Sequence, residues 1–294
     1  VAPYTACHGG DLMMRIPRRY LPVALAPDSV VALNADAAHH VARVLRMEVG
    51  AAVCLFNGEG GEYQAVLHSI NKSHVYAQIL SYSPRDAESP LHVTLAQGIP
   101  RGERMDYTLQ KAVELGVARI APLFSERCEV RLQGERLDKR IGHWQGIVIS
   151  ACEQCGRTRI PPLATPMTLQ HWLSTSSFSG NGLHLVLDPR VPHRDVQMLR
   201  EGRFRHPASG DTCASMHGAG CREQPPHSLA HCTKPADNNI TLLIGPEGGL
   251  SDTEITAAED VGFTRIRVGP RILRAETAGI AVLAALQSMW GDLR

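Results

Sequence analysis

The sequence predicts an α/β protein with two parts, a small amino-terminal β-barrel and a carboxy-terminal domain on a mostly parallel sheet. Three observations predict this fold class. Short alternating apolar runs follow one another over residues 14–83, which is typical of a small barrel. Strand-like and helix-like segments alternate over residues 91–294, which indicates a parallel sheet. Three of the later strand-like segments also end in closely similar turns, in LVLDP, LLIGP and IRVGP.

Composition limits the class of protein. The 294 residues carry a formal net charge of +1, so any nucleic-acid surface must be a local basic patch. No window approaches the roughly 18 apolar residues of a membrane span, and no secretory leader is visible. The eight cysteines are scattered rather than arranged as a disulfide framework. We therefore expect a cytoplasmic protein with reduced thiols and no membrane partner.

The amino-terminal part consists of short strands. Residues 1–13 have no periodicity, and we expect a disordered extension upstream of a natural start at Met13 or Met14. The predicted barrel of residues 14–83 contains the runs SVVALN, AAVCLFNG, GEYQAVLHSI and SHVYAQILSY. Asn57-Gly58 and Gly60-Gly61 between two of these runs predict a hairpin. Residues 84–90 are polar and end in proline, which indicates a linker.

The carboxy-terminal part, residues 91–294, alternates strands and helices. Strands are predicted at 91–99, 117–124, 182–189, 240–246 and 263–270, and helices at 103–116, 137–156, 251–262 and 275–290. Ser251 and Glu254 form a capping-box pattern at the start of the third of these helices. Residues 204–239 are rich in Pro, Gly, Ser and His and predict a disordered insertion. Their Cys and His residues lack zinc-knuckle spacing, so we expect no metal.

The three similar turns predict a ligand pocket. In a parallel sheet such turns emerge at the carboxyl edge, where α/β folds bind ligands. The turn GPEGG resembles a phosphate loop, but it has no Lys and places Glu247 where a phosphate would be repelled. Leu250, Ile272 and Leu273 add apolar surface. Such a pocket suits a ligand that is partly adenine-like and partly cationic, a description that S-adenosylmethionine (SAM) meets.

The motifs IGPEGGLS and VGPRILRAETA resemble the RsmE family of SPOUT-class RNA methyltransferases. RIPRRYL, HHVARVLRMEVG, QGIPRGERMDYTLQKAVELGV and ACEQCGR occur in the family's order, so the resemblance covers nearly the whole chain from Met14. It implies an amino-terminal PUA-like barrel that binds RNA, a carboxy-terminal domain tied in a trefoil knot, and a homodimer. It also implies SAM-dependent methylation of N3 of a specific uridine in 16S ribosomal RNA. We expect the substrate to be the assembled small subunit.

The resemblance assigns a set of cofactor-binding residues. They are Leu187, Gly245, Glu247, Gly248, Gly249, Gly269, Ile272, Leu273, Arg274 and Ala278. Glu247 either faces the positive half of SAM or caps the adjacent helix. The candidate catalytic residues are Arg274, which would stabilise the uracil oxygen, and Glu276, which would accept the proton from N3. The alternative is that these two residues only shape the knot and the dimer contact.

A local basic cluster predicts RNA contact. Residues 15–46 contain five Arg against two Asp, a local charge of +3. The candidate RNA-binding residues are Arg15, Arg18, Arg19, His40, Arg43, Arg46, Arg101, Arg104, Lys111 and Arg157. Aromatic residues make up 5% of the chain, so base capture is expected to rely on Arg planes and hydrogen bonds.

Two other functions stay open. A ribose 2′-O-methyltransferase of the same fold would show GNEG-like and SLNVS-like motifs, which GPEGG and RAETA do not match. A non-catalytic RNA-binding ribosome-assembly protein would use the barrel alone and bind no cofactor. Cys152 and Cys155 form a C-x-x-C pair within a predicted helix, where redox or zinc use is not expected.

Overall fold

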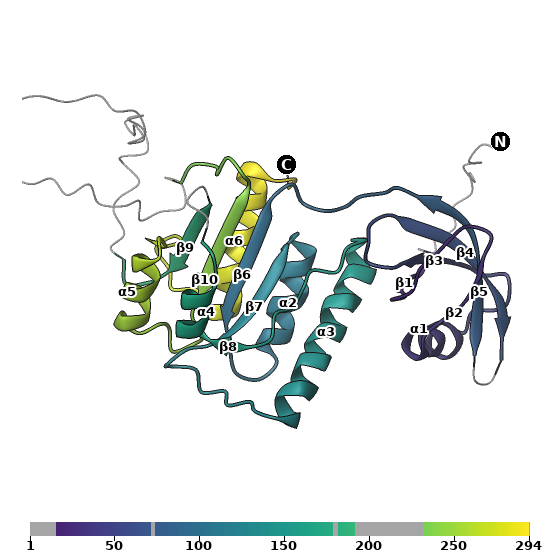
Figure 1. The fold of residues 1–294 in the computed structure, drawn as a ribbon, viewed down its shortest axis with the longest axis horizontal. Helices are drawn as coiled ribbons and strands as arrows, with labels where there is room; N and C mark the ends of the chain where they lie inside the picture. Colours follow the sequence, from purple (N-terminus) through teal and green to yellow (C-terminus); the bar gives the residue numbers. More distant parts are fainter. Residues whose placement is uncertain (1–15, 72–73, 179–181, 192–231, 294) are drawn as a thin grey trace, which may run out of the picture. The chain divides into compact units, whose positions relative to one another are not determined.

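A computed structural model of the chain describes residues 16–71, 74–178, 182–191 and 232–293 (Figure 1). Contacts between Cα atoms divide the chain into two units. The first contains the described residues up to Glu88 together with His143–Pro161, and the second contains Ser89–Gly142 and the described residues from Pro162 on. The predicted extension 1–13 and most of the predicted insertion 204–239 lie outside the described residues. The predicted domain boundaries stay a prediction.

The first unit is built on a five-stranded sheet in the order β1-β3-β4-β5-β2. The four predicted runs form strands, and β3 and β4 are antiparallel across the predicted hairpin. The short elements β1, α1 and the π-helical turn η1 were not predicted, because three to five residues are too few to show a period. The elements are β1 (Arg18–Tyr20), β2 (Val30–Ala32), α1 (Ala35–His39), η1 (His40–Val44), β3 (Ala52–Phe56), β4 (Glu62–Ile70) and β5 (Val75–Ser83).

A buried ion pair joins β1 to β4 in this unit. The guanidinium of Arg18 pairs with the Glu62 carboxylate, and both side chains are at most 10% exposed. Arg18 also donates to the carbonyls of Gly156 and Arg157 at 3.3 and 3.2 Å and lies 5.2 Å from the Phe56 ring centroid. Arg18 is therefore surrounded by protein groups, and its contacts hold β1 in place.

Glu62→Ala is expected to destabilise the first unit by about 3–5 kcal/mol, because it leaves the Arg18 cation buried without its carboxylate. Glu59→Ala, which changes an exposed carboxylate in the neighbouring hairpin, is the matched control and should change stability by about 0.5 kcal/mol at most. Urea denaturation read by hydrogen exchange of the β3 and β4 peptides measures both. Equal effects of the two changes would contradict the structural role of the pair.

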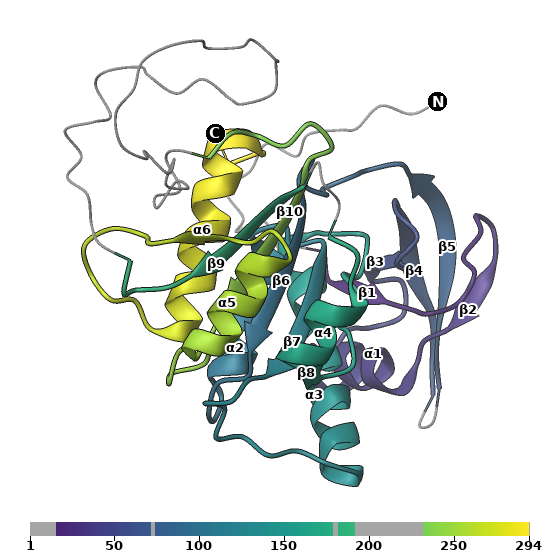
Figure 2. The same ribbon diagram turned by 60° about the vertical axis from the view of Figure 1, so that its left-hand side comes forward.

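The second unit is built on a six-stranded sheet in the order β11-β9-β10-β6-β7-β8, in which every pair is parallel. Figure 2 shows α4 and α5 on one side of this sheet and α6 on the other. Its elements are β6 (His92–Gly98), α2 (Arg104–Glu114), β7 (Arg119–Phe124), β8 (Met167–Thr168), α4 (Leu169–Thr175), β9 (Leu183–Leu187), β10 (Asn239–Ile244), α5 (Asp252–Asp260), β11 (Thr264–Ile266) and α6 (Ala275–Trp290). Helix α3 (Glu135–Cys155) begins in this unit and ends in the first.

Both faces of this sheet are covered, which explains its nearly continuous apolar strands. Trp172 of α4, Ile255 of α5 and Phe263 pack with Val186 and Leu243 on one face. On the other face, Gly279 of α6 lies against β6 and β10, so near that an added Cβ would come within 3.4 Å of the Leu95 side chain. None of the described helices combines the length and the apolar composition that a transmembrane helix requires.

Most predicted elements of this unit are confirmed. The capping box of α5 is present: Ser251 Oγ accepts from the Glu254 amide at 3.2 Å, and Glu254 Oε2 accepts from the Ser251 amide at 2.9 Å. β8 and α4, of two and seven residues, were missed. Strand β10 begins at Asn239, which pairs with His92, one residue before the predicted start of this strand. The trefoil knot stays a prediction.

Candidate functional site

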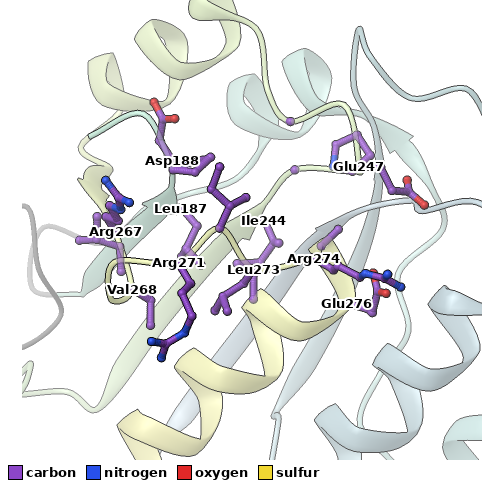
Figure 3. A pocket seen from close by; sticks show the side chains of 18 of the residues that line it. Leu187, Asp188, Ile244, Glu247, Arg267, Val268, Arg271, Leu273, Arg274 and Glu276 are labelled. Atoms are coloured by element: carbon purple, nitrogen blue, oxygen red, sulfur yellow. The ribbon is translucent and has the colours of Figure 1, made fainter. Parts of the chain in front are cut away.

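The three similar turns meet at one cavity. Strands β11, β9 and β10 are neighbours in the sheet and parallel, so their carboxyl ends share an edge. A cavity of about 540 Å³ lies there, lined by residues of the segments 187–189, 244–249 and 266–278 and by Arg104 of α2 (Figure 3). This volume lies within the usual range of small-molecule sites, roughly 300–1,000 Å³. The second unit therefore carries a cofactor-sized pocket at its carboxyl edge.

The structure brings most of the predicted cofactor residues to this cavity. Leu187, Gly245, Glu247, Gly249, Ile272, Leu273, Arg274 and Ala278 line it. Gly248 and Gly269 do not. Gly248 instead contacts residue 127: an added Cβ would lie 2.9 Å from Arg127 Cβ, and Arg127 Nη1 donates to the Gly248 carbonyl at 3.2 Å. Gly269 has φ +67° and accepts a hydrogen bond from Arg267 Nε at 3.1 Å.

The turn between β10 and α5 folds back on itself. The Gly249 amide donates to the Pro246 carbonyl at 2.8 Å, and Gly249 has φ +68°, which favours glycine. A Cβ at Gly245 would come within 3.0 Å of backbone atoms of Gly249 and Leu250. Glycine at 245 is therefore required by close approach of the backbone, and glycine at 249 by its conformation.

One wall of the cavity is apolar. Ile244 and Ile266 line it and are almost fully buried, and Leu187, Val268, Leu273 and Ala278 also line it. Ile272 also lines the cavity, although its side chain is 77% exposed. This wall combines branched aliphatic side chains with backbone that a ligand can approach. Such a surface suits a flat uncharged ring.

Glu247 has partners that neither sequence alternative named. Its Oε1 accepts from the Arg101 amide at 2.9 Å and pairs with the Arg104 guanidinium, while the start of α5 is capped by Ser251. Burial raises the pKa of Glu247, but hydrogen bonds from its own backbone, the Arg101 amide and Arg104 outweigh burial and hold the pKa below its ordinary value. The ionised carboxylate thus ties the GPEGG turn to the beginning of α2.

The two predicted catalytic residues lie at the same end of the cavity as Glu247, and Arg104 lies within ion-pair distance of both Glu247 and Glu276 (Figure 3). Arg274 is the exposed residue that precedes α6, and Glu276 lies in the first turn of α6 with its side chain 12% exposed. Glu276 Oε1 lies 3.7 Å from Arg104 Nε. Glu276 Oε2 is buried and has no hydrogen-bond partner among the described residues. Buried acceptors are nearly always paired, so this oxygen is available to accept a proton from a ligand.

Asp188 was not predicted from the sequence as a site residue, although the LVLDP turn that contains it was predicted to border the pocket. The Asp188 side chain is 2% exposed and accepts from Arg190 Nε at 2.8 Å and from Arg265 Nη2 at 2.5 Å. Burial raises the pKa of Asp188, but these hydrogen bonds outweigh it and hold the pKa below its ordinary value. Asp188 therefore adds a second ionised carboxylate to the cavity wall.

The predicted RNA-binding residues of the first unit divide into two groups. Arg18 and Arg157 are buried, and Arg157 pairs with Glu88 at 2.5 Å, while Arg19 pairs with Glu153. These pairs assign the three side chains a structural role. Arg43 and Arg46 are exposed in and after η1, and His40 is partly buried. The pKa of His40 is lowered by burial and by the nearby charges of Arg19 and His39. Arg15 lies outside the described residues.

In the second unit the predicted RNA-binding residues lie on or next to α2. Arg101 pairs with Glu129, and Lys111 pairs with Glu114 at 2.9 Å. Arg104 lines the cavity. The pairs of Arg101 and Lys111 are partly or fully exposed, where an ion pair is worth at most about 1 kcal/mol, so these cations remain available to an anionic partner.

Comparisons with known proteins agree with this geometry. A family model described as an RNA methyltransferase domain matches residues 87–287, and one described as an RNA methyltransferase PUA domain matches residues 33–80. The chain is 33% identical to the ribosomal RNA small subunit methyltransferase E of Buchnera aphidicola subsp. Schizaphis graminum over 95% of this chain and 98% of that protein. Its namesake from Synechocystis is 31% identical over 91% of this chain and 77% of that protein.

Two solved structures are similar along nearly the full chain. The ribosomal RNA small subunit methyltransferase E of Neisseria gonorrhoeae, bound to SAM, has a TM-score of 0.77 and 35% identity and covers 95% of this chain and 100% of that one. A methyltransferase from Legionella pneumophila in complex with SAM has a TM-score of 0.75 and 38% identity, with the same coverage. The chain therefore belongs to the family of RNA methyltransferases that the ribosomal RNA small subunit methyltransferase E proteins represent.

Proposed function

We propose that this protein transfers a methyl group from SAM to N3 of a specific uridine in 16S ribosomal RNA. The observation that carries the proposal is the cavity at the carboxyl ends of β9, β10 and β11, with an apolar wall and two ionised carboxylates. The similar proteins from Neisseria gonorrhoeae and Legionella pneumophila hold SAM. Relatives named ribosomal RNA small subunit methyltransferase E support the choice of RNA.

The residues of the cavity fit SAM. Asp188 and Glu247 are ionised and are compatible with a ligand that carries a positive sulfonium. Leu187, Ile244 and Leu273 supply apolar surface for an adenine ring. When bound, SAM supplies an electrophilic methyl group. Calorimetry of SAM with the purified chain separates this proposal from a non-catalytic RNA-binding protein, which would show no binding.

We assign two steps at the uracil base, removal of the N3 proton and stabilisation of the charge that follows, to residues at the start of α6. Attack by N3 requires that its proton leave, and Glu276 Oε2, a buried acceptor without a partner among the described residues, is assigned to take it. Charge then grows on the uracil oxygens, where the exposed guanidinium of Arg274 can donate. Both residues line the cavity, which supports these roles over a purely structural one.

The exposed cations of the first unit are assigned to the RNA backbone. Arg43 and Arg46 are exposed within the segment that matches an RNA methyltransferase PUA domain. Phosphate contacts of this kind dominate the affinity of proteins for RNA.

Arg43→Glu combined with Arg46→Glu is expected to weaken RNA binding about tenfold or more at low salt and to flatten its salt dependence, because two phosphate contacts are lost. SAM affinity should not change, since neither residue lines the cavity. Filter binding over a salt series measures the first effect and calorimetry the second. The matched Arg43→Lys, Arg46→Lys variant keeps both charges and should bind nearly as the wild type. A charge reversal that leaves the salt slope unchanged contradicts the assignment.

The proposed function also assigns a role to each part of the chain, an oligomeric state and an RNA substrate. We assign RNA binding to residues 14–83 and methyl transfer to residues 91–294, in a cytoplasmic homodimer that acts on the assembled small subunit. Matches to a PUA model and a methyltransferase model in these two parts support the division. Sedimentation of the protein tests the dimer. Rates on assembled subunits and on naked 16S RNA test the substrate, and faster transfer to naked RNA would overturn that choice.

A further inference from the structure

A second cavity, of about 700 Å³, adjoins the first. It is lined by residues of the loop before α2, of α2 and of the start of α6, all within the second unit. Arg104, Arg274 and Glu276 line both cavities. Arg104 and the two assigned catalytic residues therefore form a wall shared by the cofactor cavity and the second cavity.

The second cavity contains an aromatic ring that packing does not explain. Tyr107 lines it and is 49% exposed. The other Phe, Tyr and Trp side chains described in the second unit are buried or partly buried. Tyr107 lies one helical turn after Arg104, so both side chains project from the same face of α2. Arg101 completes the cavity with a second exposed cation.

We propose that this second cavity receives the target uridine, extruded from the RNA, with its base stacked on Tyr107. The inference rests on the proposed function and names the place of its substrate. A base held inside RNA structure cannot reach a methyl donor, so it must be unstacked, and aromatic side chains commonly replace the lost stacking. Arg101 and Arg104 supply positive charge for the flanking phosphates.

The shared wall gives the orientation of the base. Methyl transfer requires the acceptor nitrogen to lie beside the donor cavity, and Glu276 is a carboxylate that lines both. A uracil stacked on Tyr107 therefore places its N3 edge toward Glu276. Arg104 pairs with both Glu247 and Glu276, so it links the cofactor turn to the residue that takes the proton.

Tyr107→Ala tests the proposal in the full-length protein. We expect kcat/KM for assembled small subunits to fall about ten- to a hundredfold, the range that follows from loss of one base stack. Tyr107→Phe keeps the ring and should stay within about threefold of the wild type. Gln110→Ala, on the exposed face of α2 outside both cavities, is the matched control and should match the wild type. SAM affinity by calorimetry and sedimentation mass should be unchanged in all three.

A second measurement locates the base directly. With 4-thiouridine at the target position, irradiation should crosslink RNA to the peptide that contains Tyr107. Wild-type kinetics of Tyr107→Ala, a crosslink confined to other elements, or a loss of activity that accompanies loss of SAM affinity or of dimer mass would each overturn the inference. A failure of the proposed function looks different, because the wild-type protein would then place no methyl on uridine N3.

Discussion

Gly245→Ala is expected to weaken SAM binding about a hundredfold while leaving the second unit folded. The added Cβ would sit within 3.0 Å of backbone atoms of Gly249 and Leu250. Backbone cannot rotate away as a side chain can, so the turn must open, and loss of about 2.8 kcal/mol of binding free energy lowers affinity about a hundredfold. The φ of Gly245 is outside the positive region, so the effect is steric rather than conformational.

Calorimetry measures this loss, and thermal unfolding checks that the fold survives. Gly146→Ala is the matched control, because no atom lies within 4 Å of the added Cβ and alanine favours the helix in which this residue lies. It should bind SAM as the wild type does. If Gly245→Ala also bound SAM with unchanged affinity, the GPEGG turn would not be the cofactor site.

Glu276→Gln is expected to lower kcat about a hundredfold or more, with SAM affinity nearly unchanged, because an amide cannot accept the N3 proton. The loss should depend on pH. As pH rises toward the pKa of the uracil, the substrate loses its proton without help, so the variant should gain rate about tenfold per pH unit and approach the wild type.

Single-turnover rates over a pH series measure this convergence. Glu114→Gln changes a carboxylate of α2 that lines neither cavity and serves as the matched control. It should follow the wild-type profile. A Glu276→Gln profile parallel to that of the wild type would show that Glu276 positions other groups and does not take the proton.

The cofactor cavity could be predicted from the sequence because its position follows from the order and direction of the strands. Alternating strands and helices give a parallel sheet, and parallel strands that end in similar turns place those turns on one edge. The capping box of Ser251 and Glu254 could be predicted because it spans four residues of sequence. These features depend on local order and on strand direction, both of which the sequence pattern carries.

The partners of charged residues could not be predicted in this way. Glu247 meets Arg104, 143 positions away in the chain, and Arg18 meets Glu62, 44 positions away. Arg18 and Arg157 were therefore predicted as RNA-binding residues, although both lie buried in ion pairs. β8 and α4 were missed for a different reason, because two and seven residues show no clear period.

The identity of the methylated atom decides whether this protein methylates N3 of uridine. Assembled small subunits from cells that lack this protein are incubated with it and with SAM labelled in the methyl group, and the RNA is digested to nucleosides. We expect the label to be recovered as 3-methyluridine. Label recovered as a 2′-O-methylated nucleoside would contradict this expectation and favour the ribose methyltransferase, and RNA without label would favour a binding protein.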